Sequence, residues 1–138
     1  MNCNEFMKMH FVLTKRIDNK LERLQRLTAL TRKTVSSFRD CPTSGRGNQQ
    51  GREDLIAAMI DLSDEIQRDY INLCRTETEM SRVIDEVEDE WVKTVLEKRC
   101  LLHKKWNIVA YEMDCSTETI FKKMPFILSE LGKALKLQ

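Results

Sequence analysis

The chain has 138 residues, of which 33% are charged and 41% hydrophobic, a balance typical of a soluble, ordered protein with one compact domain or a small domain plus an extended element. No apolar run approaches the roughly 18–20 residues of a membrane span, and the N-terminus lacks the apolar core of a signal peptide. Five scattered cysteines without a C-x-x-C pair argue against a disulfide framework and indicate a reducing, cytoplasmic location.

The formal net charge of +1 conceals four blocks of different charge. Residues 1–39 carry +6, residues 40–52 carry +1, residues 53–90 carry −10 and residues 91–138 carry +4. Such segregation bears on the choice of partners more than the total charge does.

The first predicted element is a helix that extends to about residue 30. Its apolar residues recur at helical spacing. They are Phe6, Met9, Leu13, Ile17, Leu21, Leu24 and Leu27. The following segment, DCPTSGRGNQQGR at residues 40–52, has three of the four glycines and one of the two prolines. Its composition predicts a loop.

A long amphipathic helix is predicted after this loop. Apolar residues recur every seven positions, and the companion positions are apolar at three of five, a period that a strand cannot keep. At 1.5 Å per residue, the helix would be about 50 Å long. The two sets of positions are Met59, Ile66, Leu73, Met80 and Val87, and Leu55, Leu62, Asp69, Thr76 and Val83.

The loop allows the two helices to fold back on each other as an antiparallel, coiled-coil-like hairpin over residues 1–88. The first helix is basic and the second acidic, which favours this pairing, although each surface ion pair contributes only about 0–1 kcal/mol. Pairing of a helix with a second chain is the alternative. We expect an all-α fold, with a boundary near residue 88 and a small C-terminal domain at 89–138.

The C-terminal domain begins with a second apolar stripe. It is predicted to comprise Trp91, Val95, Leu96, Arg99 and Leu102. The next segment, WNIVAYEMDCSTETIFKKMPF at residues 106–126, has the spacing of a helix-turn-helix. Ala110 is small enough for a close helix crossing, Asp114 tolerates the left-handed turn position, and Ile120 would anchor the second helix. Ile108, Val109 and Met113 would complete the inner face.

Ser116 is the expected N-cap of the second helix of this unit, which would begin at Thr117. Pro125 cannot donate a hydrogen bond to the carbonyl of Phe121 and disfavours helical geometry at Met124. The second helix should therefore end or kink near Met124, and PFILSELGKALKL should form a separate helix with Pro125 at its first position.

Several basic residues of this domain could neutralise phosphates, the term that dominates affinity for nucleic acids. They are Lys98, Arg99, Lys104 and Lys105 before the first helix of the unit, and Lys122 and Lys123 on the second. The alternative is a plain three-helix packing unit without a ligand.

The chain has, in order, the segments RIDNKLERLQRL near the start, the Pro/Gly loop, the acidic helix, VLEKRCLLHKKWNIVAYEMDCSTETIF and a terminal KALKL. This order of segments resembles that of small phage and prophage proteins of Gram-positive bacteria that are related to the ArpU/RinA-type transcriptional regulators. The resemblance covers nearly the whole chain and is most specific in L-x-x-R-C-L-x-x-x-x-W-x-x-V-A-x-x-M-x-x-S, from Leu96 to Ser116.

That family ends in a helix-turn-helix similar to region 4 of bacterial sigma factors, so the resemblance implies DNA binding and control of phage genes. The resemblance also implies that Trp106 and Ala110 are core residues of the helix-turn-helix. The implied DNA-binding residues are Ser116, Thr117, Glu118, Lys122 and Lys123, with Lys104 and Lys105 as phosphate contacts. Glu118 could accept a hydrogen bond from a cytosine amino group, or it could simply be a favourable charge in the first turn of its helix.

The sequence therefore predicts a DNA-binding transcriptional regulator of phage or prophage genes, in the cytoplasm of a bacterial host. Double-stranded DNA is the expected partner, and a homodimer or RNA polymerase would add affinity, because one such unit binds weakly. Two alternatives are a helical interaction protein that does not read DNA, such as an anti-repressor or polymerase inhibitor, and a DNA-packaging adaptor like a small terminase subunit.

An enzyme is not expected. The two histidines, His10 and His103, are far apart in the sequence and are predicted to lie in helices, and no nucleotide-binding, hydrolase or metalloprotease motif is present. Cys100 and His103 form a C-x-x-H, but a zinc site needs about four ligands in paired clusters. We expect no metal and no cofactor, and we expect Cys100 to be a small buried hydrophobic residue.

Overall fold

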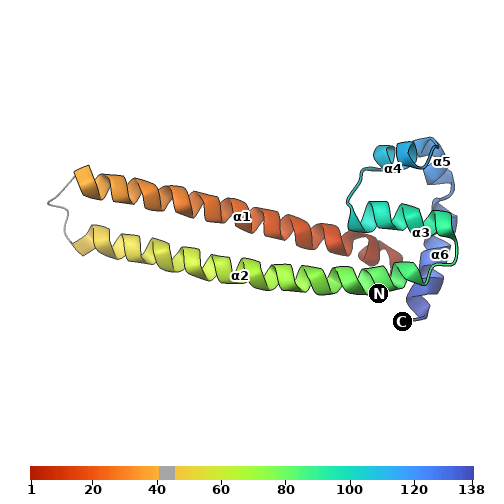
Figure 1. Ribbon diagram of the computed structural model, residues 1–138, viewed down its shortest axis with the longest axis horizontal. Coiled ribbons are helices and arrows are strands. Elements are labelled where there is room, and N and C mark those ends of the chain that lie inside the picture. The colour runs from red at the N-terminus through yellow and green to blue at the C-terminus, as the bar shows by residue number, and fades with distance from the viewer. Residues whose placement is uncertain (41–45) are drawn as a thin grey trace. The chain divides into compact units, whose positions relative to one another are not determined.

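The computed structural model describes residues 1–40 and 46–138, and the side chains of residues 1–33 and 49–138. Every element in the described part is a helix, which confirms the all-α fold (Figure 1). The elements are α1 (Cys3–Asp40), α2 (Arg46–Asp85), α3 (Glu90–Leu96), the π-helical turn η1 (Glu97–Leu101), α4 (Trp106–Glu112), α5 (Thr117–Lys122) and α6 (Met124–Lys136).

The chain divides into two compact units. One, here called the arm, is Lys15–Asn72, and the other, the core unit, combines Met1–Thr14 with Leu73–Gln138. The predicted boundary lay near residue 88, whereas the core unit also includes the first turns of α1 and the last turns of α2. Phe6, Met80 and Ile84 are fully buried in the same hydrophobic cluster as the C-terminal helices, and this shared burial explains the grouping.

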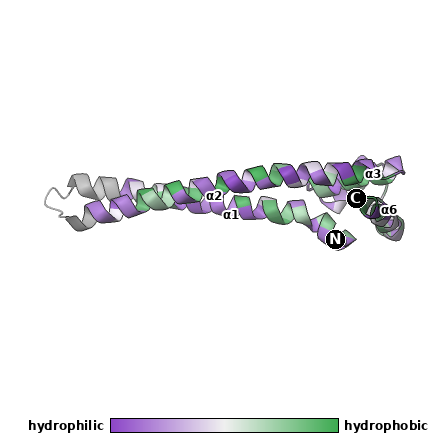
Figure 2. Cartoon of the chain, turned by 90° about the horizontal axis from the view of Figure 1, so that it is seen from below, coloured by the Kyte–Doolittle hydropathy of each residue, from purple (hydrophilic) through white to green (hydrophobic). Residues whose placement is uncertain are grey.

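In the arm, α1 and α2 pair as antiparallel helices, as predicted. The heptad of α2 forms the seam, where Leu62 and Ile66 are buried, and Ile17 of α1 is buried as well. Lys20 of α1 forms ion pairs with Asp69 (2.5 Å) and Glu65 (3.7 Å) of α2. Figure 2 shows hydrophobic and hydrophilic residues alternating along both long helices, as expected of helices with one apolar face.

The predicted loop at residues 40–52 is wrong at Asp40, where α1 still continues, and from residue 46 onward, where α2 has already begun. Gly51 is helical, and a Cβ added there would meet nothing within 4 Å. A helix that is already held by its heptad can extend over a glycine at a cost of only about 1 kcal/mol. The rest of the predicted loop, residues 41–45, lies outside the described residues.

The core unit has one continuous hydrophobic core. The predicted stripe of α3 is only partly right, because Trp91 and Arg99 are half-buried and Leu102 is 61% exposed. The turn η1 is π-helical and has more residues per turn than an α-helix. The residues after Leu96 therefore point to other sides of the helix than an α-helical period predicts. The buried residues of this segment are Val92, Val95, Leu96 and Cys100.

Cys100 is buried, as predicted, and burial raises the pKa of its thiol to about 12. This thiol is therefore protonated at neutral pH and is not a nucleophile. The four cysteines within the described residues are all free, and Cys41 lies outside them.

The two histidines lie side by side in the core unit. His103 is not helical as predicted but lies in the segment before α4, with a left-handed φ of 56°. His10 of α1 contacts it through Nδ1, with the rings stacked at 4.5 Å between centroids, and its Nε2 lies 3.2 Å from Glu77 Oε2. This cluster joins α1, α2 and the segment that leads into α4.

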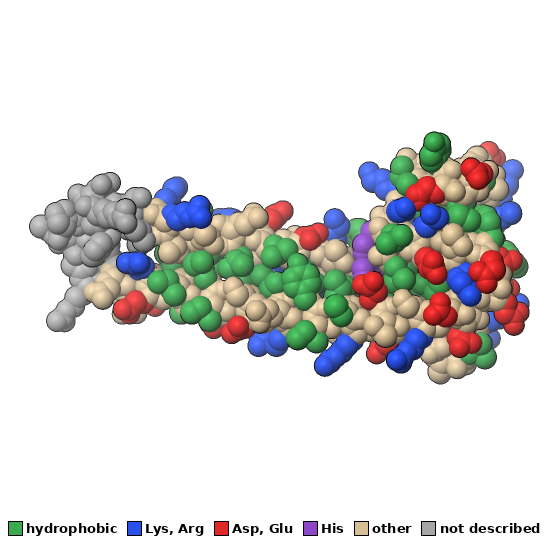
Figure 3. Space-filling view, viewed as in Figure 1, with side chains coloured by type: hydrophobic (Ala, Val, Ile, Leu, Met, Phe, Trp, Pro, Cys, Tyr) green, Lys and Arg blue, Asp and Glu red, His purple; other side chains and the backbone are tan. Residues whose placement is uncertain are grey.

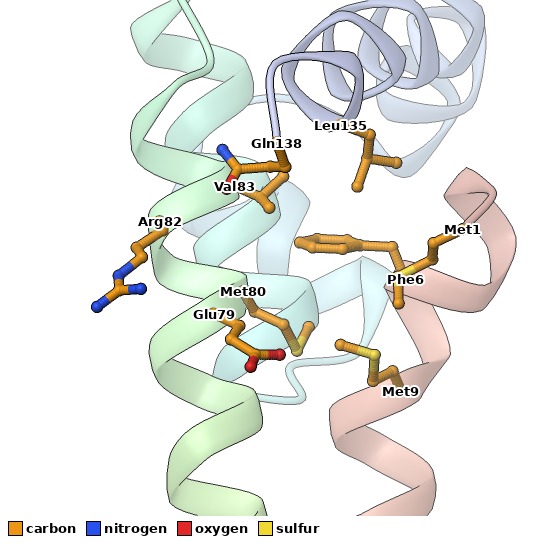
Figure 4. A pocket seen from close by; sticks show the side chains of 9 residues that line it. All are labelled: Met1, Phe6, Met9, Glu79, Met80, Arg82, Val83, Leu135 and Gln138. Atoms are coloured by element: carbon orange, nitrogen blue, oxygen red, sulfur yellow. The ribbon is translucent and has the colours of Figure 1, made fainter.

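A pocket of about 400 Å³ opens between the first turns of α1, the end of α2 and the C-terminus of α6 (Figure 4). The side chains of Phe6, Met80, Val83 and Leu135 face its interior, whereas Arg82 points away from it. The pocket marks the place where the N-terminal turns of α1 pack on the core, and its lining is mainly apolar.

Candidate nucleic-acid interface

Helices α4 and α5 pack as a helix-turn-helix in which three sequence predictions are confirmed. Ala110 (2% exposed) and Ile120 (0%) are buried between the helices, and Asp114 takes the left-handed turn position with φ 56°. The amide of Cys115 donates to the carbonyl of Ala110 (3.0 Å), and the amide of Asp114 donates to that of Tyr111 (3.2 Å). This pair of hydrogen bonds is the Schellman motif, which ends a helix at a left-handed residue.

The second helix has the predicted ends. Ser116 caps α5, because its Oγ accepts a hydrogen bond from the amide of Thr119 (3.1 Å). The helix ends at Lys122, close to the predicted end near Met124. The separate helix α6 begins at Met124, so Met124 is helical against the prediction and Pro125 is the second residue of α6 and not its first. Only six residues therefore form α5, and its exposed surface is short.

The inner face of α4 is narrower than predicted. Val109 is buried and Met113 is half-buried, but Ile108 is 44% exposed. Val109 and Ala110 form the buried face of α4, and Ile108 lies about 100° around the helix from Val109 and about 200° from Ala110, outside that face. Trp106, predicted as a core residue, is half-buried against the core.

Phe121 is a surface residue of α5 that the sequence interpretation did not select. It is 53% exposed, and its ring lies edge-on to that of Trp106 at 6.2 Å between centroids. The guanidinium of Arg99 lies 4.8 Å from the centre of the Trp106 ring, and Arg99 Nη1 donates to the carbonyl of Lys104. Phe121 therefore packs against Trp106, whose ring is in turn held by Arg99. The position of Phe121 three residues after Glu118 and one before Lys122, on the same face of the helix, was the signal that it faces outward.

The predicted DNA-binding residues at α5 are close together at the surface. Glu118 and Lys122 are both more than three-quarters exposed and form an ion pair of 3.4 Å. Lys123 is exposed, and its ammonium lies 4.6 Å from the centre of the Trp91 ring. Thr117 is half-buried and Ser116 is committed to its capping hydrogen bond.

The two predicted lysines before α4 differ in their environment. Lys104 is bound to Glu112 of α4 by hydrogen bonds of 2.5 and 2.7 Å, and Lys98 donates to the same carboxylate at 3.0 Å. Hydrogen bonds from Lys104 and then Lys98 lower the pKa of Glu112 below its ordinary value of 4.5. Lys105 is exposed, next to Trp106 and hence to α5. Two lysines before α4 therefore share one carboxylate within the protein, which leaves a net charge of +1, whereas Lys105 is not part of this cluster.

Within the described residues, no group of three His, Cys, Asp or Glu side chains is arranged to bind a metal ion. No described helix combines the length and the apolar composition needed to cross a membrane.

Residues 33–132 match the model of the family DUF1492, whose description is "Protein of unknown function". Neither the curated proteins nor the solved structures include a match. The matched segment includes the end of α1, all of α2 and the helix-turn-helix. Because it comprises well over half of the 138 residues, the chain belongs to the DUF1492 family.

Proposed function

We propose that this protein is a DNA-binding transcriptional regulator of phage or prophage genes, and that α5 enters the major groove as its recognition helix. The observation that carries the proposal is the capped left-handed turn between α4 and α5, which presents Glu118, Phe121 and Lys122 together at the surface. Helix-turn-helix proteins read base edges with such side chains. The phage context rests on the resemblance to the ArpU/RinA-type regulators.

The exposed residues of α5 favour particular bases. Glu118 can accept a hydrogen bond from the cytosine N4 amino group, and Phe121 can contact the thymine C5-methyl group. The helix has no Asn or Gln, the residues that form bidentate pairs with adenine, whereas its basic residue Lys122 can pair with guanine O6 and N7. We therefore expect α5 to read cytosine, thymine or guanine and not adenine.

The affinity of one such unit for DNA should be low. Lys105, Lys122 and Lys123 are exposed lysines that can contact phosphates, and Lys122 is shared with Glu118. Three phosphate contacts give modest binding that falls steeply with salt. A homodimer or contact with RNA polymerase would supply the remaining affinity.

Genome-wide DNA capture tests the proposal with the wild type beside Lys122→Ala/Lys123→Ala. We expect the wild type to enrich discrete sites and the double variant to lose most of that enrichment. Lys133→Ala/Lys136→Ala on α6 removes the same charge from exposed positions and should retain it. Absence of enrichment for the wild type, or equal enrichment for both double variants, would contradict the proposal.

A second candidate function is that of a helical interaction protein that does not read DNA. It is favoured by apolar residues exposed on α4 and just before it, namely Leu102 (61%), Ile108 (44%) and Tyr111 (81%). Ile108 and Tyr111 are three residues apart and therefore neighbours on the surface of α4, and exposed apolar neighbours can mark protein contacts. Under this function the wild type would enrich no DNA in the capture experiment.

A further inference from the structure

The arm exposes four large apolar side chains on α2, namely Ile56 (39%), Ile60 (57%), Tyr70 (45%) and Ile71 (55%). Between its helices, Ile17, Leu62 and Ile66 are buried, and the half-buried apolar residues are Leu21, Leu24, Leu27, Leu55 and Met59. The four exposed residues are outside this packing, and exposed apolar side chains gathered on one helix mark contacts with another protein surface.

The exposed residues form one strip along α2. Their spacings of 4, 10 and 1 residues place them within about 100° of the helix circumference. Ser63 and Gln67 lie in the same strip, so it has no charged residue between Ile56 and Ile71. Figure 3 shows a face on which hydrophobic side chains follow the two long helices while charged side chains lie toward the outer edges.

The charges of the arm identify the partner. Its described α1 segment, residues 15–33, has seven basic and two acidic residues, and its described α2 segment, residues 49–72, has two basic and six acidic residues. When two arms face each other about a two-fold axis, α1 can lie opposite α2 of the other copy or opposite its own equivalent. Only the first arrangement places opposite charges across both helix contacts.

We propose that a second copy of this chain covers the strip, so that two arms form a four-helix bundle with α1 of each copy opposite α2 of the other. In this bundle the complementary charges lie across the contacts of α1 with α2 of the other copy, and each copy contributes one strip of α2 to the apolar interior. The same surface is used on both copies, as a two-fold interface requires. The dimer itself does not depend on the proposed function. Only its role, which is to join two DNA-binding units, rests on that function.

Sedimentation equilibrium of the full chain without DNA tests this inference. We expect a wild-type mass of twice 16.3 kDa, and a mass of 16.3 kDa for Ile60→Glu/Ile71→Glu at the same concentration. Ala58→Glu/Asn72→Glu is the matched control, because it adds the same charge at exposed positions of α2 outside the strip, and it should sediment as the wild type does. Wild-type monomers, or a dimer that survives the strip substitutions, would overturn the inference.

Two further measurements complete the test. If the glutamate variant loses its helical circular dichroism, Ile60→Ser/Ile71→Ser adds no charge and should still weaken dimerisation at least tenfold; unchanged dimerisation would overturn the inference. Raising the salt concentration should weaken the wild-type dimer, because opposite charges face each other, and a dimer strengthened by salt would exclude the proposed arrangement. A stable dimer that captures no DNA would contradict the proposed function alone.

Discussion

Single residues decide what the surface near α5 can do, and Glu112 is the clearest case. Its carboxylate binds two lysines that would otherwise be available for phosphates, Lys98 and Lys104. The protein therefore uses part of its basic surface to attach α4 to the segment before it. The same hydrogen bonds keep the pKa of Glu112 low, which links the stability of this region to pH.

We predict that Glu112→Gln lowers the thermal unfolding midpoint at neutral pH and that the difference from the wild type shrinks below pH 4.5. A carboxyl with a depressed pKa stabilises the fold above its unfolded-state pKa, and this contribution is lost as the pH falls and the group is protonated. Circular dichroism melts between pH 7 and pH 3 measure the difference. Glu118→Gln, which removes an exposed ion pair, should change the midpoint little at any pH. A constant difference for Glu112→Gln across this range would contradict the assignment.

The helices differ in how much of them could be predicted from the sequence. The seam of the arm was predictable, because a heptad fixes which residues face the partner helix, and Leu62 and Ile66 lie there. The turn at Asp114 and the cap at Ser116 were predictable from local chemistry. The exposure of Leu102 was not, because the π-helical turn depends on packing that periodicity does not report.

Contacts between distant residues were the least predictable. His10 and His103 are 93 positions apart and meet only because α1 and the segment before α4 share one core. Phe121 was missed for another reason. The resemblance directed attention to charged residues, whereas its support by Trp106 follows from the packing of α4 against α5.

The start of α2 gives a prediction at the scale of the element. Because Gly51 is helical and an added Cβ meets nothing, Gly51→Ala should raise the free energy of unfolding by about 0.5–1 kcal/mol. Urea titration followed by circular dichroism measures this change. Gly132→Ala in α6 is a second helical glycine substitution for comparison. Its added Cβ would lie 3.8 Å from Cys3 Sγ, an ordinary packing distance, whereas the Cβ at Gly51 would touch nothing. No stabilisation by Gly51→Ala would indicate that α2 begins later than Arg46.

At the scale of the whole molecule, the two proposals divide the protein between its compact units. The arm offers an uncharged strip to a second copy, and the core unit offers α5 to DNA. Two weak readers joined in one dimer would bind a paired site far more tightly than either alone, because the second contact becomes intramolecular. The central claim is that α5 reads bases, and it can be separated from simple attraction to phosphates.

The most direct test uses a DNA fragment that the wild type enriches in the genome-wide capture, and a fragment of the same base composition in shuffled order. Fluorescence anisotropy at fixed salt concentration measures the affinity of the full chain for each. We predict that the wild type prefers the enriched fragment by at least about 100-fold. Glu118→Ala/Phe121→Ala should lose most of this preference while binding the shuffled fragment at least as tightly as the wild type, because Lys122 is released from its ion pair. Replacing thymine by deoxyuridine should weaken wild-type binding about three- to fivefold, the cost of one lost methyl contact. Equal wild-type affinity for the enriched and shuffled fragments would contradict base reading by α5.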